Sequence, residues 1–307
     1  MTAIAAADGS SRDTAFFGGG IAVVAWGFGP LIVRALSASS TTIALYRITL
    51  AVPVLVALAY VFGDGITWAM IRSALKPGSL FFLSIITSFA SFQRTSIALA
   101  TLIPAVQPAL ILFLAPRIFG ERSSRRQNLL AVVALCGVVG VVLAAGGGGR
   151  SDLVGNLLAV ANLVFWTAYF IEVKKARAGG AHAWSFLACV VGVCSVFIIP
   201  YALAVSDDLG AIGGSDWWYL TLLIALPGTA GHGLMTWAAR HLDVSVASLM
   251  TLASPVVSAV GAWIIYNESL QPLQIVFAAV VLGALGSIVV GARADVVRET
   301  AMSGPVE

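Results

Sequence analysis

Two long stretches of this chain follow the same plan, 147 residues apart. Residues 95–127 align with residues 242–274 without a gap, and both are apolar stretches with matching proline and glutamate positions. The matched identities are spread over the whole stretch: Ala100 with Ala247, Leu102 with Leu249, Pro108 with Pro255, Glu121 with Glu268 and Gln127 with Gln274. Self-similarity at a fixed spacing indicates a repeated structural unit, so we expect the chain to fold as two copies of one unit.

The similarity extends beyond these two stretches. At the same spacing, Pro53 matches Pro200 and Gly63 matches Gly210. At a spacing of 140, the beginnings of the two copies match through Trp26 with Trp166, Val33 with Val173, and Arg34 with Lys174. The predicted repeats are residues 15–146 and residues 154–292, with tails at 1–14 and 293–307.

The composition places the repeats in a membrane. Hydrophobic residues make up 59% of the chain, charged residues make up 10%, and the mean hydropathy is +0.98. A soluble domain carries roughly 45–50% apolar and about 25% charged residues, so this excess has to face lipid. Since a membrane-spanning helix takes about 20 apolar residues, we predict ten spans: 15–34, 40–62, 79–93, 96–118, 127–146, 154–173, 185–205, 217–238, 244–266 and 272–291.

Five spans in each copy imply an inverted repeat. An odd number of crossings makes the second copy enter the membrane in the opposite orientation, which is a common plan of secondary transporters. The predicted fold is therefore an all-α membrane protein with ten transmembrane helices in two inverted five-helix repeats.

The basic residues predict the orientation. With both termini in the cytoplasm, four basic residues lie outside: Arg34, Arg47, Arg94 and Arg150. The other thirteen lie inside: Arg12, Arg72, Lys76, Arg117, Arg122, Arg125, Arg126, Lys174, Lys175, Arg177, Arg240, Arg293 and Arg298. Because short cytoplasmic loops are enriched in Lys and Arg, we expect a multi-pass protein of the bacterial inner membrane with both termini cytoplasmic.

The sequence lacks the motifs of several classes of enzymes and binding proteins. The centres of the spans carry no Asp or Glu for an aspartyl protease, and the chain has no zinc-protease, serine-elbow or phosphate-loop motif. Cys136, Cys189 and Cys194 have no metal-ligand spacing, so no metal and no cofactor is expected. The net charge of +3 forms no basic patch for nucleic acid. We therefore expect no enzyme; the partners are a small-molecule substrate and the lipid bilayer, and the oligomeric state stays open, a monomer included.

Polar and aromatic residues inside the spans are the candidates for substrate binding. Such groups are costly in hydrocarbon unless they face a cavity or each other. Trp26 and Trp166 lie in the middle of their spans at equivalent positions, Tyr169 follows Trp166 by three residues on the same helix face, and His232 stands between two glycines. The predicted substrate-binding set is Trp26, Tyr46, Gln107, Trp166, Tyr169, His232 and Trp237.

Arg47 and Gln107 each have a structural interpretation as well. Arg47 follows the start of its span closely, so its side chain can reach the outer surface. Gln107 precedes a proline and can satisfy the local backbone. Pro104 and Pro108 in span four and Pro255 in span nine, of which Pro108 and Pro255 are matched, are predicted to kink these helices and to take part in gating.

These residues together resemble the drug/metabolite transporter superfamily, and in particular its EamA-type branch. The resemblance rests on Tyr46-Arg47, on Pro108 followed by Gly120-Glu121, on Trp166 with Tyr169, and on Pro255 followed by Asn267-Glu268. It covers about residues 15–292. The second copy departs from the family in having Asn267 where Gly is usual, and Cys194 where the first copy has Arg47. The resemblance implies structural roles for the Arg and Gly-Glu positions.

The resemblance also implies the export of small metabolites. The length and the aromatic residues are most similar to those of an exporter of aromatic amino acids, so we expect export of amphipathic metabolites such as amino acids with large apolar side chains. The alternatives are an exporter of lipophilic cations, which usually holds a membrane-embedded acid, a proton-coupled exporter, and a non-transporting scaffold or receptor. Because His232 is the one mid-span group that titrates near neutral pH, and it has no acidic partner, we expect uncoupled, facilitated diffusion by alternating access.

Overall fold

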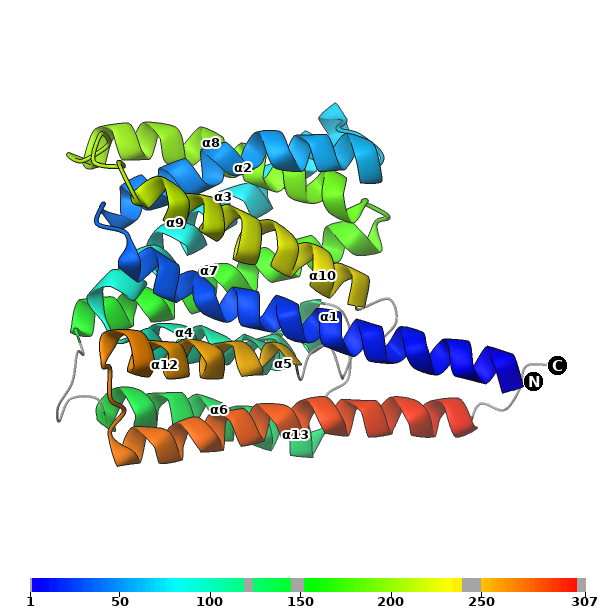
Figure 1. Ribbon diagram of the computed structural model, residues 1–307. Helices are drawn as coiled ribbons and strands as arrows, with labels where there is room; N and C mark the ends of the chain where they lie inside the picture. Colours follow the sequence, from blue (N-terminus) through cyan, green and yellow to red (C-terminus); the bar gives the residue numbers. More distant parts are fainter. Residues whose placement is uncertain (1, 119–123, 145–151, 239–249, 303–307) are drawn as a thin grey trace.

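The computed structural model describes residues 2–118, 124–144, 152–238 and 250–302. Within these ranges the side chains at 2–13, 115–116, 177–178, 232–233, 236–237, 289 and 291–302 are left undescribed. The described residues form helices joined by turns and loops, and they contain no strand (Figure 1). The prediction of an all-helical protein is confirmed for these ranges.

The helices follow the predicted spans in order. The helices of the first repeat are α1 (Thr2–Ala35), α2 (Ser40–Phe62), α3 (Trp68–Arg94), α4 (Ile97–Ala105), α5 (Gln107–Ile118) and α6 (Arg125–Ala144). The helices of the second repeat are α7 (Leu153–Ala178), α8 (Ala183–Val205), α9 (Asp216–Leu223), the π-helix η2 (Ile224–Ala230), α10 (Gly231–Ala238), α12 (Ala253–Tyr266) and α13 (Pro272–Met302).

Seven helical segments of the described chain are long and apolar enough to cross a membrane. They correspond to the first seven predicted spans, and the fourth joins α4 and the first part of α5 as Ile97–Leu114. Two shorter apolar segments, Ala253–Tyr266 and Pro272–Ile288, correspond to the last two predicted spans. The protein is thus a multi-pass membrane protein.

Short polar side chains start several of these helices. Ser39, Thr67 and Ser96 each accept a hydrogen bond from the backbone N–H three residues later, at the starts of α2, α3 and α4. Such N-caps satisfy donors that have no partner inside the helix. The polar residues between the apolar runs therefore fix where α2, α3 and α4 enter the bundle.

The predicted break in the fourth span is confirmed. Pro104 cannot donate to the carbonyl of Ala100, and Pro108 cannot donate to the carbonyl of Pro104, so two helical hydrogen bonds are lost in succession. The chain turns at Val106, where α4 has ended and α5 has not begun. In the second repeat α12 begins at Ala253, after a turn at Leu252, and Pro255 lies in its first helical turn.

The eighth predicted span, 217–238, is not one regular helix. Its middle is the π-helix η2, with α9 before it and α10 after it. Pro227 lies inside η2 and has no N–H to donate, and the N–H of Gly231 donates to the carbonyl of Leu226 with the wide spacing of a π-helix. The stretch is thus helical from Asp216 to Ala238, but its middle has π-helical spacing, which the sequence did not indicate.

Corresponding helices of the two repeats pack in corresponding ways. The second helices of the repeats, α2 and α8, lie side by side at one edge of the bundle, and the last helices, α6 and α13, lie side by side at the opposite edge (Figure 1). Between these edges α3 packs on α7, as α1 packs along α9, η2 and α10. Each pairing crosses from one repeat to the other, so the core is shared by both.

Apolar side chains also cover the outside of the bundle. Two buried clusters form the interior, one around α2, α3 and α8 and one around α4, α6 and α13. Outward-facing residues of α2 and α8 remain exposed although they are large and apolar, for example Val61, Phe62, Val196 and Leu203. Apolar surface of this extent is suited to contact with lipid.

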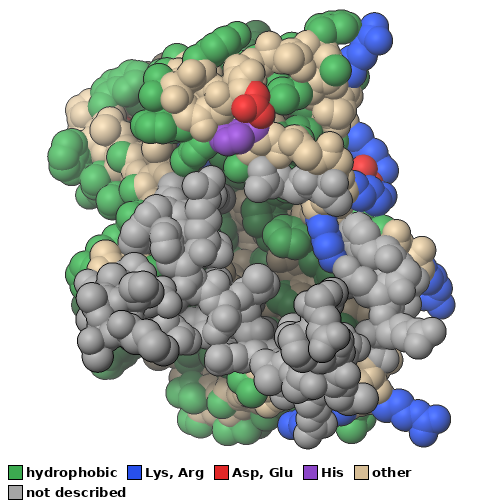
Figure 2. All heavy atoms as spheres, turned by 90° about the vertical axis from the view of Figure 1, so that its right-hand side faces the viewer, with side chains coloured by type: hydrophobic (Ala, Val, Ile, Leu, Met, Phe, Trp, Pro, Cys, Tyr) green, Lys and Arg blue, Asp and Glu red, His purple; other side chains and the backbone are tan. Residues whose placement is uncertain are grey.

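Charged side chains lie towards the ends of the bundle. In Figure 1, α1 begins and α13 ends at the same end. Figure 2 looks onto this end, and Lys and Arg side chains gather along one edge of it. Lys76 and Lys175 both contact the carboxylate of Glu172, at 2.9 and 3.0 Å.

Candidate substrate site

Three aromatic rings form a cluster between α3 and α7. The rings of Trp166 and Tyr169 lie 5.1 Å apart, and Phe81 of α3 lies 5.1 Å from Tyr169 and 6.4 Å from Trp166. These separations are typical of attractive aromatic pairs. The spacing of three residues in α7 therefore places both predicted side chains on one face, as expected, and α3 supplies a ring that was not predicted.

A cation lies next to this cluster. Arg47 of α2 lines a small cavity together with Phe81, with Leu187 of α8 and with Gly228 and Thr229 of η2. The guanidinium lies over the ring of Phe89, 5.5 Å from its centre. The cavity thus lies between α2 and α3 of the first repeat and α8 and η2 of the second.

Trp26 fixes α1 against the π-helix. Its indole Nε1 donates a hydrogen bond to the carbonyl of Pro227 at 3.2 Å. A Cβ on Gly231 would come within 2.7 Å of the same Nε1, so this position of the helix requires glycine. Trp26 and Trp166 thus occupy comparable places in the two repeats, each against the helix of the other repeat.

Tyr46 and Gln107 lie apart from the aromatic cluster. The Tyr46 hydroxyl donates to the carbonyl of Leu209 at 3.0 Å, and its ring makes an edge-to-face contact with Trp217. Gln107 begins α5, and its buried Nε2 has no acceptor among the described residues. Tyr46 therefore contacts the second repeat near the start of α2. In the part of the chain that the structure describes, Gln107 keeps an unpaired Nε2 donor at the break between α4 and α5.

Two of the predicted residues have undescribed side chains. His232 and Trp237 belong to α10 by their backbone, but their side chains lie outside the described residues. The three predicted gating prolines lie in α4, α5 and α12, at or next to the turns described above.

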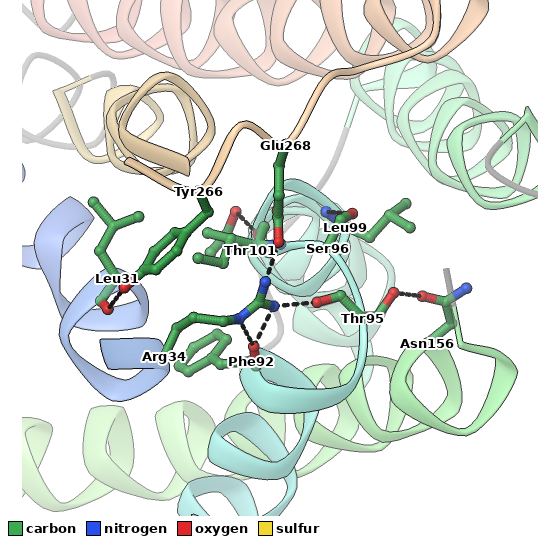
Figure 3. Close-up of polar contacts among 11 residues, drawn as sticks. Leu31, Arg34, Phe92, Thr95, Ser96, Leu99, Thr101, Asn156, Tyr266 and Glu268 are labelled. Carbon is green, nitrogen blue, oxygen red and sulfur yellow. Dashed lines mark hydrogen bonds and ion pairs between the residues drawn. The ribbon is translucent and has the colours of Figure 1, made fainter. Parts of the chain in front are cut away.

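A buried ion pair joins the two repeats at the end of the bundle opposite to the chain termini. Arg34, in the last turn of α1, pairs with Glu268, which follows α12 (Figure 3). Arg34 also donates from Nε to the carbonyl of Phe92 at 2.7 Å and from Nη2 to the carbonyl of Thr95. The two side chains are 6% and 13% exposed, so this pair is screened from water.

Glu268 has a second role at this place. Its other oxygen accepts the backbone N–H of Ile97 at 2.9 Å, which is the first residue of α4. Asn267 positions the glutamate by ending α12 in the left-handed conformation, with φ at 52°. Gly and Asn are the residues that tolerate this conformation best, which explains why Asn267 can replace the glycine of the family pattern.

A second polar cluster lies close by. Asp208 accepts hydrogen bonds from Ser39 Oγ at 2.7 Å, from Thr42 Oγ1 at 2.6 Å and from Ser206 Oγ at 2.7 Å. Burial of the carboxyl group raises its pKa, but the hydrogen bonds from Thr42, Ser39 and Ser206 outweigh burial and hold the pKa of Asp208 well below its ordinary value. The carboxylate therefore joins the start of α2 to the loop after α8.

These contacts border a wide cavity at the same end. It measures about 510 Å³ and is lined by Arg34, Ser37, Ser39, Gln93 and Asp208, among others. It opens to the surface, and the ion-paired Arg34 and the hydrogen-bonded Asp208 form part of its wall. In the repeat alignment Arg34 matches Lys174 and Glu268 matches Glu121. No pattern in the sequence indicated that Arg34 and Glu268 pair with each other.

The comparisons with known proteins agree with this architecture. The EamA-like transporter family matches residues 14–143 and 153–290, one match for each repeat. A solved structure, described only as "Crystal structure of protein", is similar with a TM-score of 0.61 and 21% sequence identity, over 92% of this chain and 98% of that chain. The comparison with curated proteins finds no match. At this identity, the structural similarity concerns the fold alone.

Proposed function

This chain belongs to the EamA-like transporter family, and we propose that it exports small amphipathic metabolites, foremost amino acids with large apolar or aromatic side chains. Family membership assigns a transport role rather than catalysis. The chemistry of the bundle interior supports the choice of substrate.

One observation carries the proposal. Between the two repeats, an aromatic cluster of Phe81, Trp166 and Tyr169 lies beside the cation of Arg47. An amino acid with a large apolar side chain offers a flat or branched apolar group for such rings and a carboxylate for a cation. The site thus has complementary surfaces for both ends of this substrate.

The same chemistry disfavours lipophilic cations. A cationic drug needs a carboxylate, and the acidic side chains that the structure describes lie in loops or towards helix ends: Asp64, Asp152, Glu172, Asp207, Asp208, Asp216 and Glu268. A buried arginine repels a cation at the cavity itself. These features support a zwitterionic or anionic substrate over the multidrug alternative.

The proposed mechanism is alternating access by two inverted five-helix repeats. Two observations support it: helices of one repeat pack on corresponding helices of the other, and α1 begins where α13 ends. In such transporters, one repeat rocks against the other around a site at their interface. We further propose that the protein lies in the bacterial inner membrane with both termini in the cytoplasm. This orientation puts the excess of Lys and Arg residues on the cytoplasmic side.

We further propose that transport is uncoupled. Proton coupling usually takes a titratable group in the membrane, and His232 is the mid-span residue of this kind in the sequence. In the sequence it stands between Gly231 and Gly233, so no adjacent residue is an acid that would stabilise its charged form. An exporter can run its substrate down a gradient because the cytoplasm accumulates the metabolite.

Purified protein in liposomes tests both proposals. Export activity is expected for L-phenylalanine, L-tryptophan and L-leucine, and not for lipophilic cations such as tetraphenylphosphonium. Transport of the cations without the amino acids would contradict the proposed substrate class. With equal substrate on both sides, an imposed pH gradient should cause no accumulation. Accumulation that is lost in His232→Ala would establish proton coupling instead.

A further inference from the structure

We propose that Arg47 is the carboxylate-binding residue of the substrate site, in the cavity that it shares with Phe81 and η2. This inference rests on the proposed function, since it assigns one end of the substrate to a particular side chain. It differs from the sequence-based interpretation, in which Arg47 reaches the outer surface.

The position of Arg47 is too deep for a surface side chain. It lies seven residues after the first residue of α2, which at 1.5 Å per residue is about 10 Å along the helix. Its Nε is fully buried, because α8 packs along α2 at this level. Its side chain is one of those that line the cavity.

No acceptor satisfies this side chain within the protein that the structure describes. Its Nε has no hydrogen-bond partner, and neither an ion pair nor any other hydrogen bond of Arg47 is found among the described residues. Its guanidinium lies over the face of Phe89, and Cys194 of α8 is near enough to interact with it electrostatically. A guanidinium carries five donors and stays charged.

A buried cation without an acceptor is costly, and a ligand carboxylate removes this cost. Leaving a charged group unpaired in an apolar interior is among the most expensive arrangements in a protein. The planar fork of arginine binds a carboxylate through two parallel hydrogen bonds, and this geometry favours carboxylates over other polar groups. Arg34, the other buried arginine described above, already has its carboxylate in Glu268.

The surroundings define the rest of the ligand. On one side of the cavity, Phe81 belongs to the aromatic cluster with Tyr169 and Trp166. On the other side lie Gly228 and Thr229 of the π-helix, and π-helical turns in membrane and soluble helices are frequent at functional sites. The ligand class is therefore a carboxylate with a large apolar body, either a zwitterionic amino acid or a simple organic acid.

The cavity has to widen for such a ligand. It measures about 30 Å³, which is the volume of roughly one water molecule. The cavity is thus too small for a whole substrate in the described conformation, and binding of one requires α2 and η2 to separate. Pro227 and Gly228 leave η2 with irregular hydrogen bonding, so this segment is suited to such a movement.

Thermal unfolding in detergent with four related probes tests the site without relying on transport. The probes are L-phenylalanine, 3-phenylpropionate, L-phenylalaninamide and phenethylamine, of which the first two carry a carboxylate. A ligand that binds the folded state raises the melting temperature. We expect the two carboxylates to stabilise the wild-type protein and the two amines without a carboxylate to have no effect.

Substitutions then assign the effect to Arg47. Arg47→Gln should abolish the stabilisation and weaken carboxylate binding about 10- to 100-fold, the range expected for a hydrogen bond to a charged group. Arg47→Lys should retain part of it, since the charge remains without the fork. The matched control is Arg72→Gln, which removes an exposed arginine that stacks on Trp68 at the far end of α2 and α3.

Moving the arginine to the equivalent position of the second repeat tests whether the effect of Arg47→Gln comes from misfolding. Cys194 is the repeat equivalent of Arg47 and interacts with it electrostatically, so the double variant Arg47→Cys with Cys194→Arg offers the guanidinium from α8 instead of α2. This variant should recover stabilisation by 3-phenylpropionate. Equal stabilisation by acids and amines, unchanged stabilisation in Arg47→Gln, or no stabilisation of the wild type by any probe would each overturn the proposal.

The outcomes also separate this inference from the proposed function. Suppose that liposomes transport no amino acid while 3-phenylpropionate stabilises the wild type and not Arg47→Gln. The carboxylate site is then supported, and the proposal of an amino acid substrate is contradicted. If amino acids are transported equally well by the wild type and Arg47→Gln, the proposed function stands and Arg47 has a structural role.

Discussion

At the scale of single residues, the acidic side chains near the wide cavity act as links between the repeats. Asp208 and Glu268 both belong to the second repeat, and both bind groups of the first. Neither lies in the middle of an apolar run, so the sequence predicts that both lie in loops. Acidic residues are common in loops and give no sign of a structural role there. Their partners lie more than 160 residues away along the chain, which is why local patterns did not identify them.

Asp208 predicts a dependence of stability on pH. Its pKa is lowered in the folded protein, so the folded state binds a proton less readily than the unfolded state. The stabilisation is therefore fully present above the unfolded pKa of about 3.9 and is lost as the pH falls below that value. We expect the melting temperature of the wild type to fall progressively as the pH is lowered below about 4, down through the lowered folded pKa, and to fall less in Asp208→Asn. Asp207→Asn, an exposed neighbour, is the control; equal pH profiles in both variants would contradict the role of Asp208.

The ion pair between Glu268 and Arg34 is expected to limit access of solvent to the end of the bundle opposite to the chain termini. Glu268→Gln leaves the charge of Arg34 buried without its partner, a loss on the order of 3–5 kcal/mol. We expect a cysteine at Ala38, which is 1% exposed in the described conformation, to react several-fold faster with an impermeant maleimide when Glu268 is replaced. The background lacks the native cysteines, and Glu172→Gln, which affects a more exposed contact with Lys76, serves as the control. A lower melting temperature with unchanged labelling would make the pair a fold-stabilising contact only.

At the scale of helices, the sequence predicted the apolar runs well because length and hydropathy are local properties. It also predicted the break between α4 and α5, since each proline removes a donor at a known place. It did not predict η2, because a single proline in a membrane helix can kink the helix or widen one turn. The outcome depends on packing, here on Trp26 against Pro227 and Gly231.

The site shows the same division. The pairing of Trp166 and Tyr169 follows from helical spacing, and their contact confirms it. The environment of Arg47 does not follow from its place in the sequence, because the burial of its side chain comes from α8, a helix more than 130 residues later. Phe81 was missed for a similar reason: one phenylalanine in an apolar run carries no signal of what it packs against.

The helix breaks predict a kinetic effect. Pro108→Ala and Pro255→Ala allow more regular hydrogen bonding where α5 and α12 begin, and so should stiffen the segments that move in alternating access. We expect slower transport in liposomes, with the substrate concentration at half-maximal rate changed less than the rate itself. Pro53→Ala, at an exposed position in α2, is a matched control within a membrane helix. Normal transport rates in both single variants would show that these prolines are merely tolerated.

At the scale of the whole molecule, the proposed inverted repeat predicts which surfaces face which side of the membrane. Ser124, before α6, and Asp207, after α8, should lie on opposite sides. Single cysteines at these positions, in a background without native cysteines, should react with impermeant reagents from the cytoplasmic and the periplasmic side respectively. Reaction of both from the periplasmic side would contradict the inverted arrangement.

Arg47 and Cys194 break the symmetry that the duplicated sequence otherwise imposes. A transporter built from two identical halves would present its substrate with two equivalent guanidiniums, and a molecule with one acidic group could then bind in two opposite poses. If Arg47 binds the substrate carboxylate as proposed, the thiol at the equivalent position of the second repeat leaves one guanidinium and therefore one favoured pose. Divergence between the two repeats would then orient the substrate, with its apolar part against the aromatic cluster of Phe81, Trp166 and Tyr169.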